Sequence, residues 1–155
     1  FAATGTGRTY AQVERSVLAG NSADGVKISA SSNATSLASV TRNAIHRNAR
    51  TAVAAEGPGL AGAVVSENTM LVINAGLSAT GPKTDFMASA NSVVPDYGAT
   101  FAFKQVDSSS FASYGNNSGY SLSDSVLSRV VAPVAALPLG VHRHARRCPR
   151  RRARH

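Results

Sequence analysis

Carboxylates are the side chains of this sequence that could support acid–base chemistry or hold a metal ion. Asp85 and Asp107 are 22 residues apart, and Asp96 falls midway between them. If one structural repeat has about that length, Asp85 and Asp107 stack, while Asp96 faces another side. An oxygen-rich calcium site usually needs more converging ligands than two. We therefore expect solvated turn carboxylates and no cofactor, with calcium as the only metal worth considering.

The other candidate catalytic side chains lack the context that their chemistry needs. His46 follows an apolar residue at a predicted corner, where a surface histidine is the expected interpretation. Ser16, Ser66 and Ser109 have no Gly-x-Ser-x-Gly surroundings, so no serine-hydrolase elbow is predicted. No phosphate-binding glycine loop occurs either. These residues favour a protein that is not an enzyme.

Residues 141–155 form a basic tail that contains seven of the 16 basic residues and none of the eight acidic ones. We favour a disordered end without function, of the kind that GC-rich DNA encodes when it is read out of frame. A cell-envelope sorting signal and an arm that binds nucleic acid or another polyanion are the alternatives. His142, His144 and Cys148 would make a poor zinc site among so many cations.

Composition narrows the class of protein further. The chain has 155 residues, enough for one domain, and the nine basic and eight acidic residues outside the tail nearly cancel. Nucleic-acid binding is therefore expected only through the tail. Cys148 is the single cysteine, which excludes an intramolecular disulfide. No run of 18 apolar residues predicts a membrane span.

Four copies of one pattern recur along the chain, and each copy is anchored by a polar residue. The anchors are Ser16, Asn43, Asn68 and Asn91, at separations of 27, 25 and 23 residues. Apolar columns lie three residues before and two residues after them: Val13, Val40, Val65 and Ala88, then Leu18, Ile45, Met70 and Val93. Two later apolar columns are Val26, Val53, Leu77 and Phe101, then Ile28, Ala55, Ala79 and Phe103. Such a unit cannot bury its apolar side alone, so the copies must stack as parallel strands.

The anchors predict a ladder of stacked asparagines at one corner of the stack. Asn43, Asn68 and Asn91 form this ladder, because asparagine tolerates the left-handed conformation of a tight corner and its amide can bond to neighbouring copies. Asn21 and Asn48, each five residues after its anchor, predict a second corner.

The segments Ser16–Asn21 and Asn43–Asn48 resemble the right-handed parallel β-helix repeat family, the pectin-lyase-like superfold, and in particular its bacterial surface or secreted members. The resemblance covers about Val13 to Asn117. It implies an all-β, right-handed parallel β-helix of four to five coils and an extracellular or cell-surface location in a bacterium. Function does not follow from it, because the superfold includes lyases, hydrolases, adhesins and binding domains.

The pectin-degrading enzymes of this superfold imply active-site motifs that this sequence lacks. It has Asn68-Thr69-Met70 in place of Asn-Thr-Asp, no Asp-Asp pair and no Gly-His-Gly. We therefore predict a non-catalytic module that serves as a scaffold or binds carbohydrate. The alternative is a degenerate or partial polysaccharide lyase or glycoside hydrolase.

The pattern divides the chain into four parts. Residues 1–12 are expected to form an incomplete leading coil, 13–120 the β-helix, 121–140 a capping or linking segment and 141–155 the disordered tail. The chain starts with Phe1 and reads as part of a longer solenoid. A solenoid with an exposed apolar end is expected to associate with itself through its coil ends.

One outward column suggests where a polysaccharide could bind. Arg15, Arg42 and Glu67 each precede a corner anchor, so they should stack about 4.8 Å apart, with an ion pair between Arg42 and Glu67. Together with Arg47 and Arg50, they are the candidate face for an acidic glycan, although a merely solvated face is the commoner outcome. No threonine column predicts an ice-binding face.

Overall fold

A computed structural model of the chain describes residues 1–48, 50–96, 101–107, 109–113 and 117–119. These residues form an all-β parallel solenoid of about four turns, and they contain no helix. The predicted all-β parallel solenoid is therefore confirmed. The expectations for residues 121–140 and for the basic tail lie outside the described residues.

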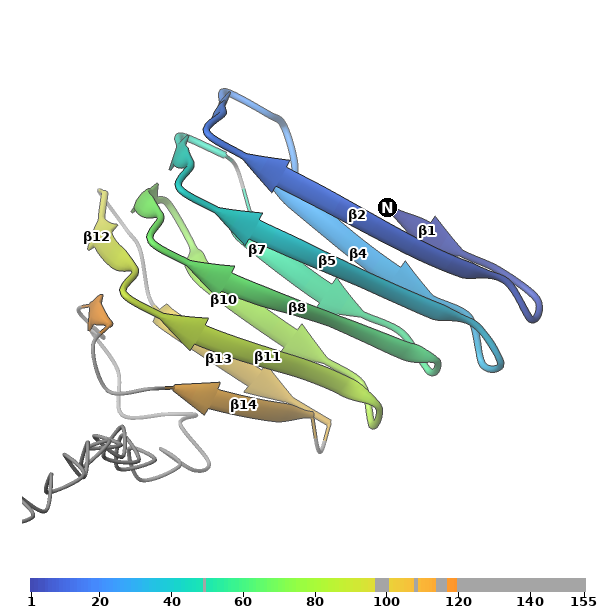
Figure 1. Cartoon of the computed structure of the whole chain (residues 1–155). Helices are drawn as coiled ribbons and strands as arrows, with labels where there is room; N and C mark the ends of the chain where they lie inside the picture. Colours follow the sequence, from blue (N-terminus) through green and yellow to red (C-terminus); the bar gives the residue numbers. More distant parts are fainter. Residues whose placement is uncertain (49, 97–100, 108, 114–116, 120–155) are drawn as a thin grey trace, which may run out of the picture.

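Each turn of the solenoid contributes one strand to each of three five-stranded parallel sheets (Figure 1). Sheet A consists of β1 (Ala2–Ala3), β4 (Val26–Ala30), β7 (Thr51–Glu56), β10 (Ala75–Thr80) and β13 (Phe101–Val106). Sheet B consists of β2 (Arg8–Glu14), β5 (Thr35–Thr41), β8 (Leu60–Ser66), β11 (Thr84–Ser89) and β14 (Ser110–Ser113). Sheet C consists of β3 (Val17–Ala19), β6 (Ala44–His46), β9 (Thr69–Val72), β12 (Ser92–Pro95) and β15 (Ser118–Gly119). Residues 1–12 thus supply β1 and most of β2.

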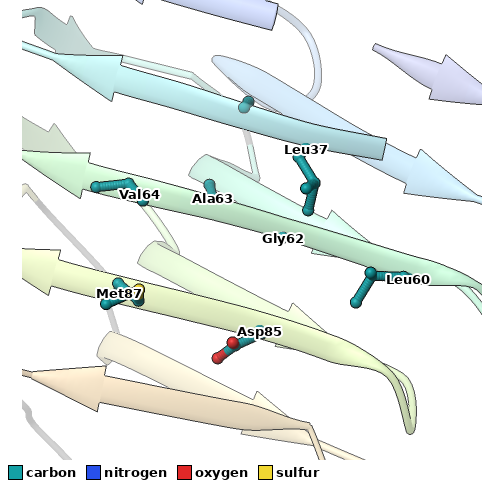
Figure 2. Close-up of a pocket in the computed structure, with 8 residues that line it drawn as sticks. Leu37, Leu60, Gly62, Ala63, Val64, Asp85 and Met87 are labelled. Atoms are coloured by element: carbon teal, nitrogen blue, oxygen red, sulfur yellow. The ribbon is translucent and has the colours of Figure 1, made fainter. Parts of the chain in front are cut away.

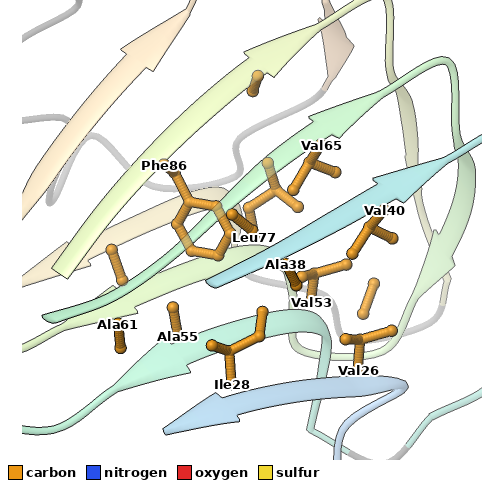
Figure 3. Packing of buried hydrophobic residues seen from close by; sticks show 14 of the residues in the cluster. Val26, Ile28, Ala38, Val40, Val53, Ala55, Ala61, Val65, Leu77 and Phe86 are labelled. Atoms are coloured by element: carbon orange, nitrogen blue, oxygen red, sulfur yellow. The ribbon is translucent and has the colours of Figure 1, made fainter. Parts of the chain in front are cut away.

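Alternation of side chains along the strands creates the core. In β5 every second residue is buried, so Ser36, Ala38 and Val40 face inward. Aliphatic side chains from the three sheets meet in the narrow interior, where Ile28, Val65 and Leu77 are fully buried (Figure 3). The many alanines of the sequence suit this interior, because closely spaced sheets leave little room for large side chains.

The two apolar columns nearest the anchors pair in the predicted register. Val13, Val40, Val65 and Ala88 are successive partners in sheet B. Leu18, Ile45, Met70 and Val93 are successive partners in sheet C. Ile45 and Met70 of this column are register partners, and both are fully buried.

The predicted register of the last turn in sheet A is wrong by two residues. Leu77 pairs with Phe103 rather than Phe101, and Ala79 pairs with Gln105 rather than Phe103. The earlier members of both columns pair as expected, for example Val26 with Val53. The cause is the connection between sheets C and A, which spans residues 73–74 in one turn and residues 96–100 in the next.

Candidate functional site

The corner between sheets B and C is a two-residue bend with the same conformation in four successive turns. The residue before each anchor has a positive φ: 50° at Arg15, 57° at Arg42, 56° at Glu67 and 52° at Ala90. The left-handed residue is therefore the one before the asparagine. The predicted reason for asparagine at this corner, its own left-handed conformation, is wrong.

The asparagines serve this corner through their side-chain amides. The Oδ1 atom of Asn68 accepts hydrogen bonds from the backbone N and the Nδ2 of Asn43, at 2.9 and 3.0 Å. Asn91 Oδ1 accepts the same two bonds from Asn68, at 3.1 and 2.9 Å. Each Nδ2 also donates to a sheet B carbonyl of the preceding turn, as from Asn68 to Val40 O at 2.9 Å. The structure therefore brings Asn43, Asn68 and Asn91 into one buried ladder.

The ladder is longer than the sequence analysis expected. Asn117 Oδ1 accepts from the N and Nδ2 of Asn91, at 2.9 and 2.8 Å. At the other end the backbone N of Ser16 donates to Asn43 Oδ1 at 2.9 Å, so the serine receives the ladder without continuing it. The signal for Asn117 was its spacing of 26 residues from Asn91, which matches the repeat.

Asn21 and Asn48 occupy the second corner, between sheets C and A. Asn48 Oδ1 accepts hydrogen bonds from the N and Nδ2 of Asn21, at 3.2 and 2.8 Å. The residues before them, Gly20 and Arg47, again have positive φ values of 70° and 54°. The same device thus turns the chain at both corners, and both asparagine sets are structural.

The candidate glycan face is electrically balanced where its side chains gather. Arg42 Nε lies 2.8 Å from Glu67 Oε2, which is the predicted ion pair. The guanidinium of Arg42 and that of Arg15 each lie 3.6 Å from Glu14 Oε1. This group of two arginines and two glutamates has no net charge, so it offers little attraction to an acidic glycan.

The ion pair also affects the titration of Arg42. The hydrogen bond from its side chain to Glu67, and then the charge of Glu67, raise the pKa of Arg42 above its ordinary value. Arg47 and Arg50 are exposed at the opposite end of β6, at the corner between sheets C and A. The five predicted residues therefore divide between two corners.

The structure separates Asp85 from Asp107. Asp85 lies in β11 and pairs with Ser110 of the next turn, while Asp107 is in the turn after β13. The expectation that these carboxylates stack is wrong, because the repeat in this part of sheet B has 25 residues rather than 22. Among the described residues, no three His, Cys, Asp or Glu side chains come together as a metal site.

A groove of about 320 Å³ lies on the outer face of sheet B. Its floor is Gly62 in β8, between Leu37 of β5 and Asp85 of β11, which are its register partners (Figure 2). Leu60, Val64 and Met87 complete the apolar walls. We call this the sheet B groove.

The sheet B groove combines apolar contact area with one charged group. Leu60, Val64 and Met87 are 42%, 48% and 38% exposed, which is unusual for aliphatic side chains so close to one another. Asp85 supplies a carboxylate at the edge, and it can accept hydrogen bonds from hydroxyl or amine groups. Such a site suits a ligand with an apolar face and polar donors.

The groove was not predicted from the sequence, although a signal for it was present. Val65 belongs to an inward column, so its neighbour Val64 must face outward in a strand with period two. The same alternation places Leu37 and Met87 outside, next to buried Ala38 and Ala88. In each case, an apolar residue next to a core position in the sequence indicated an apolar side chain on the outer face.

Within the described ranges, no helix is long and apolar enough to cross a membrane. The tail interpretations, with His142, His144 and Cys148, concern residues outside those ranges.

No protein-family model, curated protein or solved structure matches this chain. The site must therefore be interpreted from its own geometry.

Proposed function

We propose that this chain is a non-catalytic binding module, and that it holds a neutral polysaccharide along the outer face of sheet B. The observation that carries the proposal is the sheet B groove, in which exposed aliphatic side chains surround a glycine floor beside one carboxylate. Sugar rings present C–H faces that pack on apolar surface, and hydroxyls that donate to a carboxylate.

The outward column through the groove supports an elongated ligand. Tyr10, Leu37, Gly62, Asp85 and Ser110 are successive register partners. Because parallel strands lie about 4.8 Å apart, this column extends for about 19 Å along the solenoid. Tyr10, 69% exposed, provides an aromatic surface at one end. A linear chain of sugars could follow this column.

Two features favour a neutral ligand over the acidic glycan considered first. The cluster of Glu14, Arg15, Arg42 and Glu67 has no net charge, and the groove contains a carboxylate that repels acidic sugars. The alternative of a partial lyase or hydrolase gains no support, because Asp85 and Asp107 do not converge. We also propose that the chain belongs to the right-handed pectin-lyase-like superfold and that it lies on the surface of a bacterium or is secreted. This part of the proposal rests on the sequence resemblance.

The test is a glycan array that carries neutral and acidic polysaccharides, followed by titration of the hits. We expect neutral glycans to bind, and we expect Val64→Ser and Asp85→Asn to weaken binding about three- to tenfold. The matched control is Val94→Ser, because Val94 in sheet C is 47% exposed and Val64 is 48% exposed. Equal losses for the two valine variants, or no binding to any glycan, would refute the proposal.

A further inference from the structure

Gly62 leaves a recess in the middle of the sheet B groove. It is the only glycine among the described strands of sheet B, and it lies between the exposed side chains of Leu60 and Val64 along β8. Its register partners on the two neighbouring strands are Leu37 and Asp85. Three aliphatic side chains and one carboxylate therefore border the place where Gly62 has no side chain (Figure 2).

The recess is closed at its base to a side chain from the strand itself. A Cβ atom at Gly62 would lie 2.8 Å from the backbone O of Asp85, which is too close without a shift of β11. It would also lie 3.4 Å from Cδ2 of Leu37, and Figure 2 shows this leucine directed toward β8. The floor thus consists of the Gly62 backbone and a leucine methyl group, and the groove of about 320 Å³ above it is open to a ligand.

The lining of the groove accepts hydrogen bonds but offers few donors. Among its described lining residues, Asp85 alone has a charged, hydroxyl or amide side chain. An ionised carboxylate accepts hydrogen bonds and donates none. A ligand group that enters the recess must therefore combine a donor with an apolar part, because a polar atom left without a partner there loses its hydration.

The side groups of neutral sugars meet this requirement to different degrees. A hydroxyl or hydroxymethyl group both donates and accepts, so its accepting role is unmet among aliphatic side chains. An acetamido group has one N–H donor and an apolar methyl group, and its carbonyl oxygen points away from the N–H and can stay in water. The acetamido group is therefore the better match to the recess.

We propose, as an extension of the proposed polysaccharide binding on which it rests, that the sheet B groove selects chains of N-acetylated amino sugars. The methyl group of one acetamido substituent packs against Leu37, Leu60 and Val64. The N–H of the same substituent donates to the carboxylate of Asp85. Because the described strands of sheet B contain one such recess, one acetamido group of each bound chain is engaged there.

The test compares three hexasaccharides that share one linkage and differ in one substituent on each ring. They are the chitin hexasaccharide, its fully deacetylated form and the cellulose hexasaccharide, each titrated calorimetrically into the full chain at about 0.15 M salt. We expect the acetylated form to bind about tenfold or more tightly than the cellulose form, since it adds a methyl group in an apolar recess and a donor for the carboxylate. The deacetylated form should also bind less tightly than the acetylated one, because it lacks the methyl group and must desolvate an ammonium group among aliphatic side chains.

Two variants locate the preference in the recess. Leu37→Ala removes one wall and Asp85→Ala removes the acceptor, so each should lower the ratio of the two affinities, acetylated to cellulose, about three- to tenfold. Leu71→Ala is the matched control, because Leu71 is a half-buried leucine on the outer face of sheet C, as Leu37 is on sheet B. It should leave the ratio unchanged. Leu60→Ala, at an exposed wall residue, repeats the test should Leu37→Ala lower the melting temperature.

The outcomes separate this inference from the proposed function. Equal affinity for the chitin and cellulose hexasaccharides would overturn the selection and leave polysaccharide binding in place. Tighter binding of the deacetylated form would overturn it too, since the carboxylate would then recognise an ammonium group. Binding of another neutral glycan on the array but of none of these three would assign the groove to a different sugar. A chain that binds no glycan at all would refute the proposed function itself.

Discussion

Asn68 shows how one side chain can hold three turns of the solenoid in register. Its Oδ1 accepts two hydrogen bonds from Asn43, and its Nδ2 lies 2.9 Å from Val40 O, Ser66 O and Asn91 Oδ1. The side chain is 1% exposed, so water cannot replace these partners. Glu67, which precedes it, adopts the left-handed conformation that makes the bend. The amide of Asn68 then bonds to the backbone groups that the bend removes from the sheet hydrogen bonds.

Replacement of Asn68 by leucine should therefore be costly. The change leaves the N of Asn43 and the carbonyl of Val40 without these partners, and we expect a loss of about 4 kcal/mol in the free energy of unfolding. His46→Ala changes a side chain of β6 that lies outside the ladder, and it should cost about 0.5 kcal/mol or less. Urea denaturation measures both. Equal losses would show that the ladder does not stabilise the corner.

At the scale of the strands, the sequence predicted two sheets well and the third less well, for a geometric reason. Sheets B and C are joined in four turns by two residues, such as Arg42 and Asn43, so a fixed offset from the anchor finds both columns. Connections between sheets C and A vary from residues 73–74 to residues 96–100, so the offset that finds the first three members of each sheet A column fails in the last turn. The inward column that contains Val65 also fixes Val64 as outward, so the outer face of β8 could be predicted, but the depth of the groove depends on the missing side chain of Gly62 between Leu37 and Asp85.

Gly76 illustrates a packing constraint that the apolar columns did not reveal. A Cβ atom at this position would lie 2.5 Å from Ala102 O and 2.6 Å from Val93 Cγ1, because β10 passes close to the interior side of sheet C. Small residues are therefore required at this inner corner, where Ala52 and Ala102 are also buried.

Gly76→Ala should thus destabilise the fold although alanine has the higher propensity for regular structure. We expect a loss of about 1–3 kcal/mol in the free energy of unfolding, from the shift of β13 or of the Val93 side chain. Ser78→Ala, on the outward face of the same strand, is the control and should change stability by about 0.5 kcal/mol or less. A Gly76→Ala variant with the wild-type urea midpoint would contradict the packing described for this corner.

At the scale of the whole molecule, each turn contacts the turns beside it, so the same side chain has a different energetic weight in the middle and at the end. Leu18 and Ile45 occupy one column of sheet C and pair directly. Ile45 has a register partner on both sides and is fully buried, whereas Leu18 lies in the first turn and is half-buried.

Truncation of the two side chains should reveal this gradient. Ile45→Ala removes a fully enclosed side chain and should cost about 3–4 kcal/mol, while Leu18→Ala should cost about 1–2 kcal/mol, since part of its surface is already in contact with water. Urea denaturation at a concentration where the chain is monomeric gives both values. A cost for Leu18→Ala that equals that of Ile45→Ala in the monomer would mean that the first turn is already enclosed.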